Sequence, residues 1–291
     1  MNRKTRAGFV GAGTVGTALA LALHRAGYRV VAVSSRTRAS AERLAARVPG
    51  CRALGDAQAV ADAADMVFVT TPDDAIARVA ASVRWRKGQA VVHCSGALSA
   101  GALARAASRG ARVGAFHPLQ TFAGVADADA LRGITFAVEA RAPLLGALTT
   151  MARALRGRCI TLEPDDRVLY HMGAALASNY VVTLAALATR LWGQARIPPD
   201  EALRALLPLL RGTVRNLEDK GLPHALTGPI ARGDMGTLRK HITALESRAP
   251  EVMQAYRALA METIPIALAK GSISAARAQR MRALLRGTTA A

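Results

Sequence analysis

Aromatic residues are scarce in this chain: they make up 4% of its 291 residues, although the formal net charge is +19. Proteins that bind nucleic acid combine a clustered basic surface with aromatic side chains that stack on bases. Here the arginines are spread along almost every segment, and no dense basic run is present. We therefore interpret the charge as a solvated basic surface and expect no specific nucleic-acid binding.

Cysteine is also rare. Cys51, Cys94 and Cys159 are odd in number, lie far apart and lack the paired spacing of metal ligands. We expect reduced thiols and no metal site. The basic N-terminal residues are followed by an apolar strand pattern rather than by the apolar core of a signal peptide. These features together predict a cytoplasmic protein.

The longest weakly charged stretch is residues 172–189, which is near the minimum length for a membrane span. It carries Ser178, Asn179, Tyr180 and Thr183, and its flanks continue as helix. We expect a buried core helix there and no membrane partner.

Hydrophobic residues make up 51% of the chain, and the length suits two domains that each have a full core. Strand and helix patterns alternate up to residue 163, which predicts an α/β fold with a doubly wound, mostly parallel sheet. From Pro164 onward no convincing strand pattern remains, and an all-α C-terminal domain is expected over 164–291. The expected strands are 7–10, 28–34, 66–71, 89–94, 112–116, 134–139 and 158–162, and the expected C-terminal helices are 165–194, 200–220, 235–247 and 250–270.

A glycine-rich turn, residues 11–16, follows the first strand and precedes a helix over 17–26. In such a turn Gly11 makes the tight bend, Gly13 lets the backbone approach a pyrophosphate, and Gly16 allows the helix to pack closely on the strand. The phosphates then bind the free N–H groups at the helix start. Residues 1–163 are therefore predicted to be a dinucleotide-binding Rossmann domain, with contacts from Gly11, Ala12, Gly13, Thr14, Val15 and Gly16.

The end of the second strand indicates which dinucleotide binds. An acidic residue there would bind the ribose hydroxyls of NAD and repel the extra phosphate of NADP. The chain has Ser34, Ser35, Arg36 and Arg38 instead, and no acid before Glu42. Hydroxyl and guanidinium groups suit a phosphate dianion, so the predicted cofactor is NADP.

Four further segments carry a family resemblance. They are Thr70-Thr71-Pro72-Asp73-Asp74, His93-Cys94-Ser95-Gly96-Ala97-Leu98, Phe116-His117-Pro118-Leu119-Gln120-Thr121-Phe122 and Leu226-Thr227-Gly228-Pro229-Ile230-Ala231-Arg232-Gly233-Asp234. The chain resembles a bacterial family of Rossmann-like oxidoreductases with a helical C-terminal domain of undefined function. More broadly, it is similar to the 6-phosphogluconate dehydrogenase-like superfamily, which includes beta-hydroxyacid dehydrogenases, ketopantoate reductases and pyrroline-5-carboxylate reductases.

The superfamily resemblance implies that the loop of Thr70, Thr71 and Pro72 lies beside the nicotinamide. It also implies that Ser95 donates to a substrate carboxylate or carbonyl, while Gly96 allows close approach. The alternative for Ser95 is a turn serine that caps the helix expected near Ser99.

The resemblance also implies a polar helical face. His171, Ala175 and Asn179 are spaced i, i+4 and i+8 and would share one face of the helix expected over 165–194. In the related dehydrogenases a catalytic lysine begins such a face. This chain has His171 at that position, and a histidine can still deliver a proton near neutral pH. The alternative is an interior histidine with a satisfied hydrogen bond.

His117, at the end of a strand, is a second candidate for the proton donor. Gln120 could hold a polar substrate, and Thr227 resembles a residue of ketopantoate reductases that supplies a substrate-binding hydroxyl. We therefore expect a homodimeric NADPH-dependent reductase of a small polar carbonyl compound, with a ketopantoate-like 2-keto acid as the leading substrate class. The alternatives are a cyclic-imine reductase of the pyrroline-carboxylate type and a non-catalytic NADP-responsive binding protein.

Overall fold

The computed structural model describes residues 3–122, 124 and 127–287. The chain divides into two compact units, Met1–Ser178 and Asn179–Ala291. The first contains the sheet, and the regular elements among the described residues of the second are all helices.

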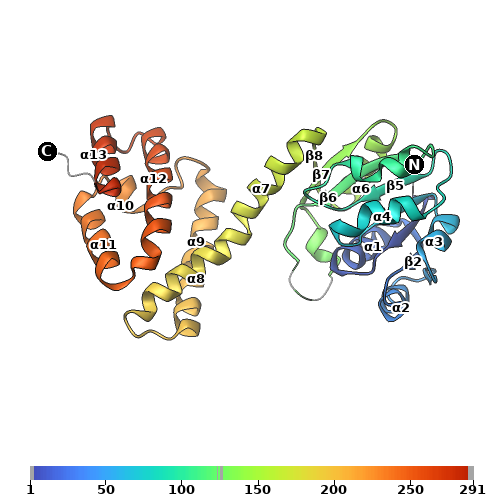
Figure 1. Ribbon diagram of the computed structural model, residues 1–291, viewed down its shortest axis with the longest axis horizontal. Coiled ribbons are helices and arrows are strands. Elements are labelled where there is room, and N and C mark those ends of the chain that lie inside the picture. Colours follow the sequence, from blue (N-terminus) through green and yellow to red (C-terminus); the bar gives the residue numbers. More distant parts are fainter. Residues whose placement is uncertain (1–2, 123, 125–126, 288–291) are drawn as a thin grey trace. The chain divides into compact units, whose positions relative to one another are not determined.

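An eight-stranded sheet forms the centre of the first unit, with the strand order β3-β2-β1-β4-β5-β6-β7-β8 (Figure 1). Every neighbouring pair is parallel except β6 and β7, which are antiparallel. This arrangement confirms the predicted mostly parallel Rossmann sheet. The strands are β1 (Arg6–Val10), β2 (Arg29–Ser34), β3 (Arg52–Ala53), β4 (Met66–Val69), β5 (Ala90–His93), β6 (Arg112–Pro118), β7 (Thr135–Ala140) and β8 (Arg158–Thr161). The two-residue β3 was not predicted, because it is too short to show a strand pattern.

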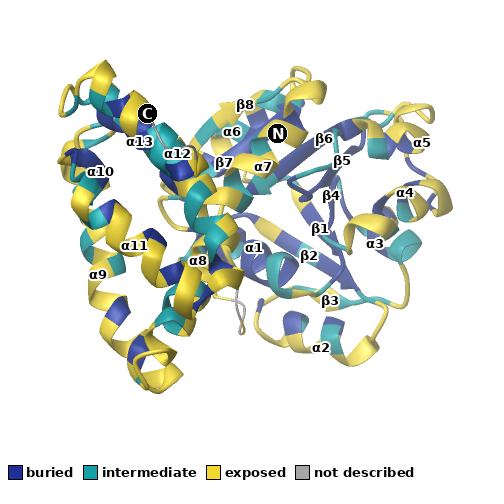
Figure 2. Cartoon of the chain, turned by 60° about the vertical axis from the view of Figure 1, so that its left-hand side comes forward, coloured by how far each residue is buried: buried dark blue, intermediate teal, exposed yellow. Residues whose placement is uncertain are grey.

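Helices cover both faces of the sheet, which explains why its strands are continuous apolar runs. Phe9 and Phe68 pack into one core cluster with α1 (Thr14–Arg25), α2 (Arg38–Ala46) and α6 (Leu144–Ala154). Their neighbours Val10 and Val69 point to the other face, where they pack with α3 (Ala57–Ala63), α4 (Asp73–Ser82) and α5 (Ala104–Ala107). The inner strands are accordingly mostly buried in Figure 2, whereas the edge strands β3 and β8 have exposed residues. Three single turns complete the unit: η1 (Ala100–Leu103), η2 (Asp129–Leu131) and η3 (Pro164–Asp166).

One helix beyond the predicted domain boundary belongs to the compact unit of the sheet. The last strand, β8, ends at Thr161, and α7 (Arg167–Ala177) follows it within the first unit. The single helix expected over 165–194 is in fact two helices, α7 and α8 (Asn179–Gly193). Ser178 separates them, because its φ of −121° and ψ of −71° depart from helical geometry. The i, i+8 spacing of His171 and Asn179 therefore spans a break in the helix.

The second unit contains the predicted helices and two that were not predicted, α10 and α13. Its elements are α8, α9 (Pro199–Lys220), α10 (Gly228–Ala231), α11 (Met235–Arg248), the single turn η4 (Pro250–Val252), α12 (Met253–Ala269) and α13 (Ala275–Arg286). Gly221, with a φ of +62°, ends α9 in the left-handed region that favours glycine. Leu238, Ile264 and Met281 are fully buried and join α11, α12 and α13 in the main core of this unit.

The prediction of a buried core helix over 172–189 is wrong for the single chain. Among the described residues, the segment Pro164–Gly193, which comprises η3, α7 and α8, is long and apolar enough to cross a membrane, and no residue of its apolar window is buried. Leu169 is 70% exposed and Val182 is 71% exposed. The apolar composition was read correctly, but it does not say whether the covering surface comes from the same chain.

Candidate active site

The glycine turn has the geometry that a dinucleotide site requires. Gly11 has a φ of +114°, and a Cβ atom there would lie 2.6 Å from the carbonyl oxygen of Thr70. A Cβ at Gly16 would lie 2.4 Å from the carbonyl oxygen of Gly11. Gly13 differs, because a Cβ atom added there would meet no atom within 4 Å. Gly11 and Gly16 thus pack the turn tightly, while Gly13 leaves open space at the start of α1.

A cleft of about 860 Å³ borders this turn. Its lining includes most of the residues predicted to hold the cofactor, namely Gly11, Ala12, Gly13, Ser34, Ser35, Arg36, Thr70, Thr71 and Pro72. Thr14 lines a neighbouring hollow of about 660 Å³ together with Thr17 and Arg43. Val15 packs against the sheet core, so its side chain supports the helix rather than facing the cleft.

The two candidate phosphate-binding arginines differ. Arg36 lines the cleft beside Ser34 and Ser35. Arg38 opens α2, and its Nε donates to Glu42 Oε1 at 2.8 Å. Arg36 is therefore the better placed cation for a phosphate at this end of the cleft. Arg78 of α4 also lines the cleft, where it pairs with Asp74 at 3.7 Å, and it was missed because its approach depends on how α4 packs on the sheet.

A second group of polar residues gathers where β5 and β6 end. His93 is the last residue of β5, Gly96 lies in the loop after it, and His117 is near the end of β6. A Cβ at Gly96 would lie 2.8 Å from Cδ2 of His171 and 2.9 Å from Nε2 of His117. Both imidazoles therefore pack against the same glycine, and the structure brings together three residues that were predicted separately.

The hydroxyl of Ser95 is engaged within the loop. Its Oγ donates to Asp73 Oδ2 at 2.7 Å and accepts from the backbone N–H groups of Ala97 and Leu98 at 3.2 and 3.0 Å. These contacts match the alternative in which Ser95 stabilises a turn. The turn that it stabilises is that of residues 95–98, whereas Ser99 is the residue that caps η1. Donation from Ser95 to a substrate stays a prediction and requires that the bond to Asp73 opens.

His117 is held by Tyr170, whose hydroxyl lies 2.7 Å from Nδ1. Burial raises the pKa of Tyr170 to about 12, so its phenol is protonated at neutral pH and can donate to Nδ1. The proton of the neutral imidazole is then on Nε2, the atom beside Gly96. Burial, followed by the nearby charges of Arg167 and His171, lowers the pKa of His117 to about 4. The ring is therefore neutral at neutral pH.

His93 has both ring nitrogens bonded. Its Nδ1 accepts from the N–H of Ser95 at 3.2 Å, and its Nε2 lies 2.9 Å from the carbonyl oxygen of Ser99. Only a ring that is protonated on Nε2 satisfies both contacts. Burial lowers the pKa of His93 to about 4, which keeps this ring neutral too. His93 thus shapes the Ser95 loop from inside the unit.

Arg167 is the least expected member of the group, because it is fully buried. Its Nη2 donates to the carbonyl oxygen of Ser95 at 2.7 Å, and its Nη1 lies 3.6 Å from Glu139 Oε2. Sequence reasoning missed Arg167 and Tyr170. A signal existed, because Tyr170 and His171 follow Arg167 by three and four residues, the spacing that places each of them beside Arg167 on a helix.

The remaining predicted site residues are Gln120 of the first unit and Asn179 and Thr227 of the second. Gln120 is exposed; its Nε2 donates to the carbonyl oxygen of Ala130 at 3.3 Å, and its Oε1 accepts from the N–H of Thr121. Asn179 begins α8 and Thr227 precedes α10, both exposed and both in the second unit. Their roles stay predictions. Within the described residues, no group of three or more His, Cys, Asp or Glu side chains is suited to a metal ion.

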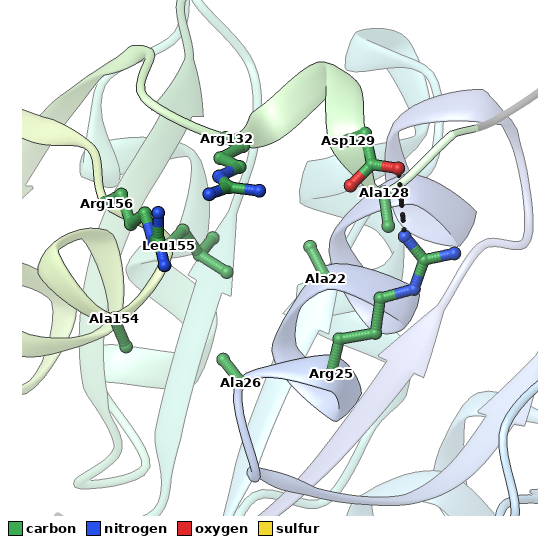
Figure 3. A pocket seen from close by; sticks show the side chains of 9 residues that line it. All are labelled: Ala22, Arg25, Ala26, Ala128, Asp129, Arg132, Ala154, Leu155 and Arg156. Carbon is green, nitrogen blue, oxygen red and sulfur yellow. Dashed lines mark ion pairs between the residues drawn. The ribbon is translucent and has the colours of Figure 1, made fainter.

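A smaller pocket of about 240 Å³ lies at the end of α1 remote from the glycine turn (Figure 3). Ala22 and Ala26 line it from α1, and Arg132 and Arg156 extend over it, while Arg25 pairs with Asp129 at 3.3 Å. None of the residues of the two groups described above lines this pocket.

Family comparisons agree with this architecture. A model of a Rossmann-like domain matches residues 2–118, and a model described as a domain of unknown function, DUF2520, matches residues 134–263. The chain therefore carries a Rossmann-like domain followed by a DUF2520 domain. A comparison with curated proteins finds no match.

Several solved structures are similar over nearly the whole chain. A proposed NADP oxidoreductase from Bacteroides fragilis is 28% identical, with 90% of this chain and 99% of that chain covered and a TM-score of 0.70. A Thermotoga maritima protein is 23% identical, with 91% and 99% covered and a TM-score of 0.73. A pyrroline carboxylate reductase from Plasmodium falciparum, solved with NADP bound, is 11% identical, with 98% and 99% covered and a TM-score of 0.62. The Thermotoga maritima and Plasmodium falciparum proteins have the same fold as this chain.

Proposed function

We propose that this chain is an NADPH-dependent reductase of a small polar carbonyl compound, with a ketopantoate-like 2-keto acid as the leading substrate class. The observation that carries the proposal is the meeting of His117 and His171 over Gly96 in the unit that also holds the glycine turn. Open α/β sheets bind ligands at the carboxyl ends of their strands, and both groups lie at such ends.

The residues of the cleft fit an NADP dinucleotide. Gly13 leaves room for a pyrophosphate at the start of α1, and Arg36, Ser34 and Ser35 offer charge and hydroxyl groups to a ribose phosphate. The bound cofactor supplies the hydride. The similar Bacteroides fragilis protein, itself described as a proposed NADP oxidoreductase, supports the same cofactor.

We propose that the two histidines have different roles in carbonyl reduction. The neutral ring of His117, with its proton on Nε2, polarises the substrate carbonyl by donating a hydrogen bond, since a neutral imidazole can serve as an electrophile. His171 is exposed and can exchange protons with solvent, so it is the group we propose as proton donor to the forming alkoxide. Gly96 leaves the space in which the two rings meet, and its predicted role of letting the substrate approach stays a prediction. Ser95 and Gln120 are proposed substrate ligands to be tested by substitution, while the catalytic role of Asn179 and the substrate-binding role of Thr227 stay predictions.

Reduction of a cyclic imine is a second candidate. The similar structures include a reductive aminase from Aspergillus terreus in complex with NADPH and ethyl levulinate, which is 19% identical, and pyrroline carboxylate reductases. A protonated imine already carries the proton that a carbonyl substrate must receive. Carbonyl reduction should therefore depend strongly on His171, whereas imine reduction should depend on it weakly.

The test is NADPH oxidation by the purified full-length chain against a panel of 2-keto acids and cyclic imines. Turnover of a 2-keto acid that falls on replacing His171 by Ala supports the first candidate. Turnover confined to imines and insensitive to His171→Ala selects the second. NADPH binding without turnover of any substrate would contradict both candidates and support the third alternative, a non-catalytic NADP-responsive binding protein.

A homodimer is part of the proposal. Val168, Leu169, Met172 and Leu176 of α7 are all more than half exposed, as are Tyr180 and Val182 of α8. Exposed apolar surface of this extent normally has a partner, and closed dimers are the commonest assembly. A second copy in the cytoplasm is the occupant we propose. Light scattering that shows a stable monomer at micromolar concentration, in the absence of detergent, would contradict it.

A further inference from the structure

The guanidinium of Arg167 is buried in the first unit with none of its surface exposed. It donates to the Ser95 carbonyl oxygen at 2.7 Å and lies 3.6 Å from the carboxylate of Glu139. Glu139 is itself buried, and its Oε1 accepts from the N–H of Ala100 at 2.9 Å. A charge in such surroundings is tolerated because it is paired and hydrogen-bonded.

The pairing is incomplete, which argues against a purely stabilising role. Arg167 Nε and Nη1 and Glu139 Oε2 have no hydrogen-bond partner. Burial lowers the pKa of Arg167 and raises the pKa of Glu139, so both charged forms are disfavoured by their surroundings. Well-packed apolar residues of similar volume are often as stabilising as a buried ion pair. Stability alone therefore does not explain Arg167.

The position of Arg167 suggests what it does. It is the first residue of α7, and Tyr170 and His171 follow three and four residues later on the same helical face. Its side chain holds the carbonyl group of Ser95, and Gly96 is the next residue. One guanidinium therefore connects the loop after β5 to the helix turn that carries His171 and the hydroxyl bound to His117.

We propose that Arg167 is a positioning residue, which holds the Ser95–Gly96 loop and the first turn of α7 together so that His117 and His171 meet over Gly96. It does not touch substrate, because it is fully buried. Its effect on catalysis rests on the proposed reductase function, whereas its effect on the histidines does not.

The charge of Arg167 provides a readout that a merely structural residue would lack. The groups that influence His117 are Asp73 on α4, His93 at the end of β5, and Arg167 and His171 on α7. Of these, Asp73 raises the pKa of His117, whereas Arg167, His171 and His93 lower it. Removal of the Arg167 guanidinium should therefore raise the pKa of His117. The burial of the His117 ring should still keep its pKa below the ordinary value for histidine.

The experiment uses full-length variants. Arg167→Met tests the loss of the guanidinium, and Arg167→Lys tests rescue by another cation. The double variant Arg167→Met/Glu139→Gln removes both charges, so that no carboxylate is left buried alone. Arg86→Met is the matched control, because Arg86 also donates to backbone carbonyl oxygens of the first unit, those of Ala61 at 2.7 Å, Asp62 at 3.4 Å and Ala64 at 2.6 Å.

Five quantities are measured for each variant: the temperature of thermal unfolding, the NADPH affinity, the titration of the histidine ring signals by NMR, and kcat and KM on the substrate found by the panel. Signals of His117 and His171 are assigned by their loss in His117→Ala and His171→Ala. His24, His224 and His241 serve as internal references.

In the double variant we expect NADPH affinity as in the wild type, displaced ring signals for His117 and His171, a raised pKa of His117, and a fall in kcat of about 100-fold. Arg167→Lys should restore part of each change, and Arg86→Met should affect thermal unfolding alone. The proposal is overturned if the double variant folds and keeps the wild-type His117 and His171 titrations, or if Arg86→Met reproduces the changes. If the wild-type chain reduces no substrate, the reductase function fails, and the NMR titration still decides the role of Arg167.

Discussion

Replacement of Gly96 by Ala tests the geometry of the histidine pair most locally. The added methyl carbon would lie 2.8 Å from Cδ2 of His171 and 2.9 Å from Nε2 of His117. Carbon atoms pack at about 3.5–4.0 Å, so one or both rings must move by roughly 0.5–1 Å. The backbone is not the obstacle, since Gly96 is not among the residues with positive φ.

A displacement of this size predicts a specific kinetic result. Misplacement of catalytic groups by about 1 Å can lower the rate about 100-fold. We therefore expect Gly96→Ala to lower kcat by roughly that factor, with NADPH affinity unchanged because Gly96 does not line the dinucleotide cleft. The assay is steady-state NADPH oxidation together with NADPH binding by fluorescence.

The matched control is Gly146→Ala in α6, where a Cβ would meet nothing within 4 Å. It should leave kcat unchanged and slightly stabilise the helix. Wild-type kcat in Gly96→Ala, with the variant folded, would refute the view that the two rings act together at this glycine.

The remaining predictions concern the cofactor and pH. Arg36→Ala should weaken NADPH binding by roughly 1–3 kcal/mol, the range for charge-assisted contacts, and should change NADH binding little. Arg38→Ala should change the binding of both dinucleotides little, because Arg38 is paired with Glu42. Calorimetric titration with both dinucleotides measures these effects, and equal affinity of the wild type for NADPH and NADH would contradict NADP preference. Acid should destabilise the fold through His93, whose pKa is lowered from 6.5 to about 4 by burial. The unfolded chain binds this proton first, so the contribution is full above about pH 6.5 and is lost as the pH falls toward 4, by at most about 3 kcal/mol. Thermal unfolding of the wild type and His93→Phe between pH 7 and 4.5 measures it, and a parallel pH dependence in both proteins would show that His93 is not responsible.

The dinucleotide cleft could be predicted from the sequence because its geometry is local. A glycine turn between a strand and a helix constrains its own backbone, so the roles of Gly11, Gly13 and Gly16 follow from their spacing. The distinction between Arg36 and Arg38 could not be made in this way. It depends on the side chain that each one meets, and Glu42 lies one helical turn beyond Arg38.

The interior of the candidate site was harder to predict. His117 and Gly96 were recognised as candidates, but their contact depends on the pairing of β5 with β6. Arg167 was missed because an arginine in a basic chain is expected at the surface, and only the tertiary structure shows that it is buried beside Glu139. The exposure of α7 and α8 was missed for the opposite reason, since an apolar helix is expected inside.

The central claim is that the chain transfers a hydride from NADPH to a small polar carbonyl compound with His171 as proton donor. The most direct measurement compares single-turnover oxidation of NADPH by the wild type and by His171→Ala, with the best 2-keto acid of the panel as substrate. The account predicts a rate lower by about 100- to 10,000-fold in the variant, with nearly unchanged NADPH affinity. An unchanged rate in His171→Ala, or the large loss in His117→Ala instead, would contradict it.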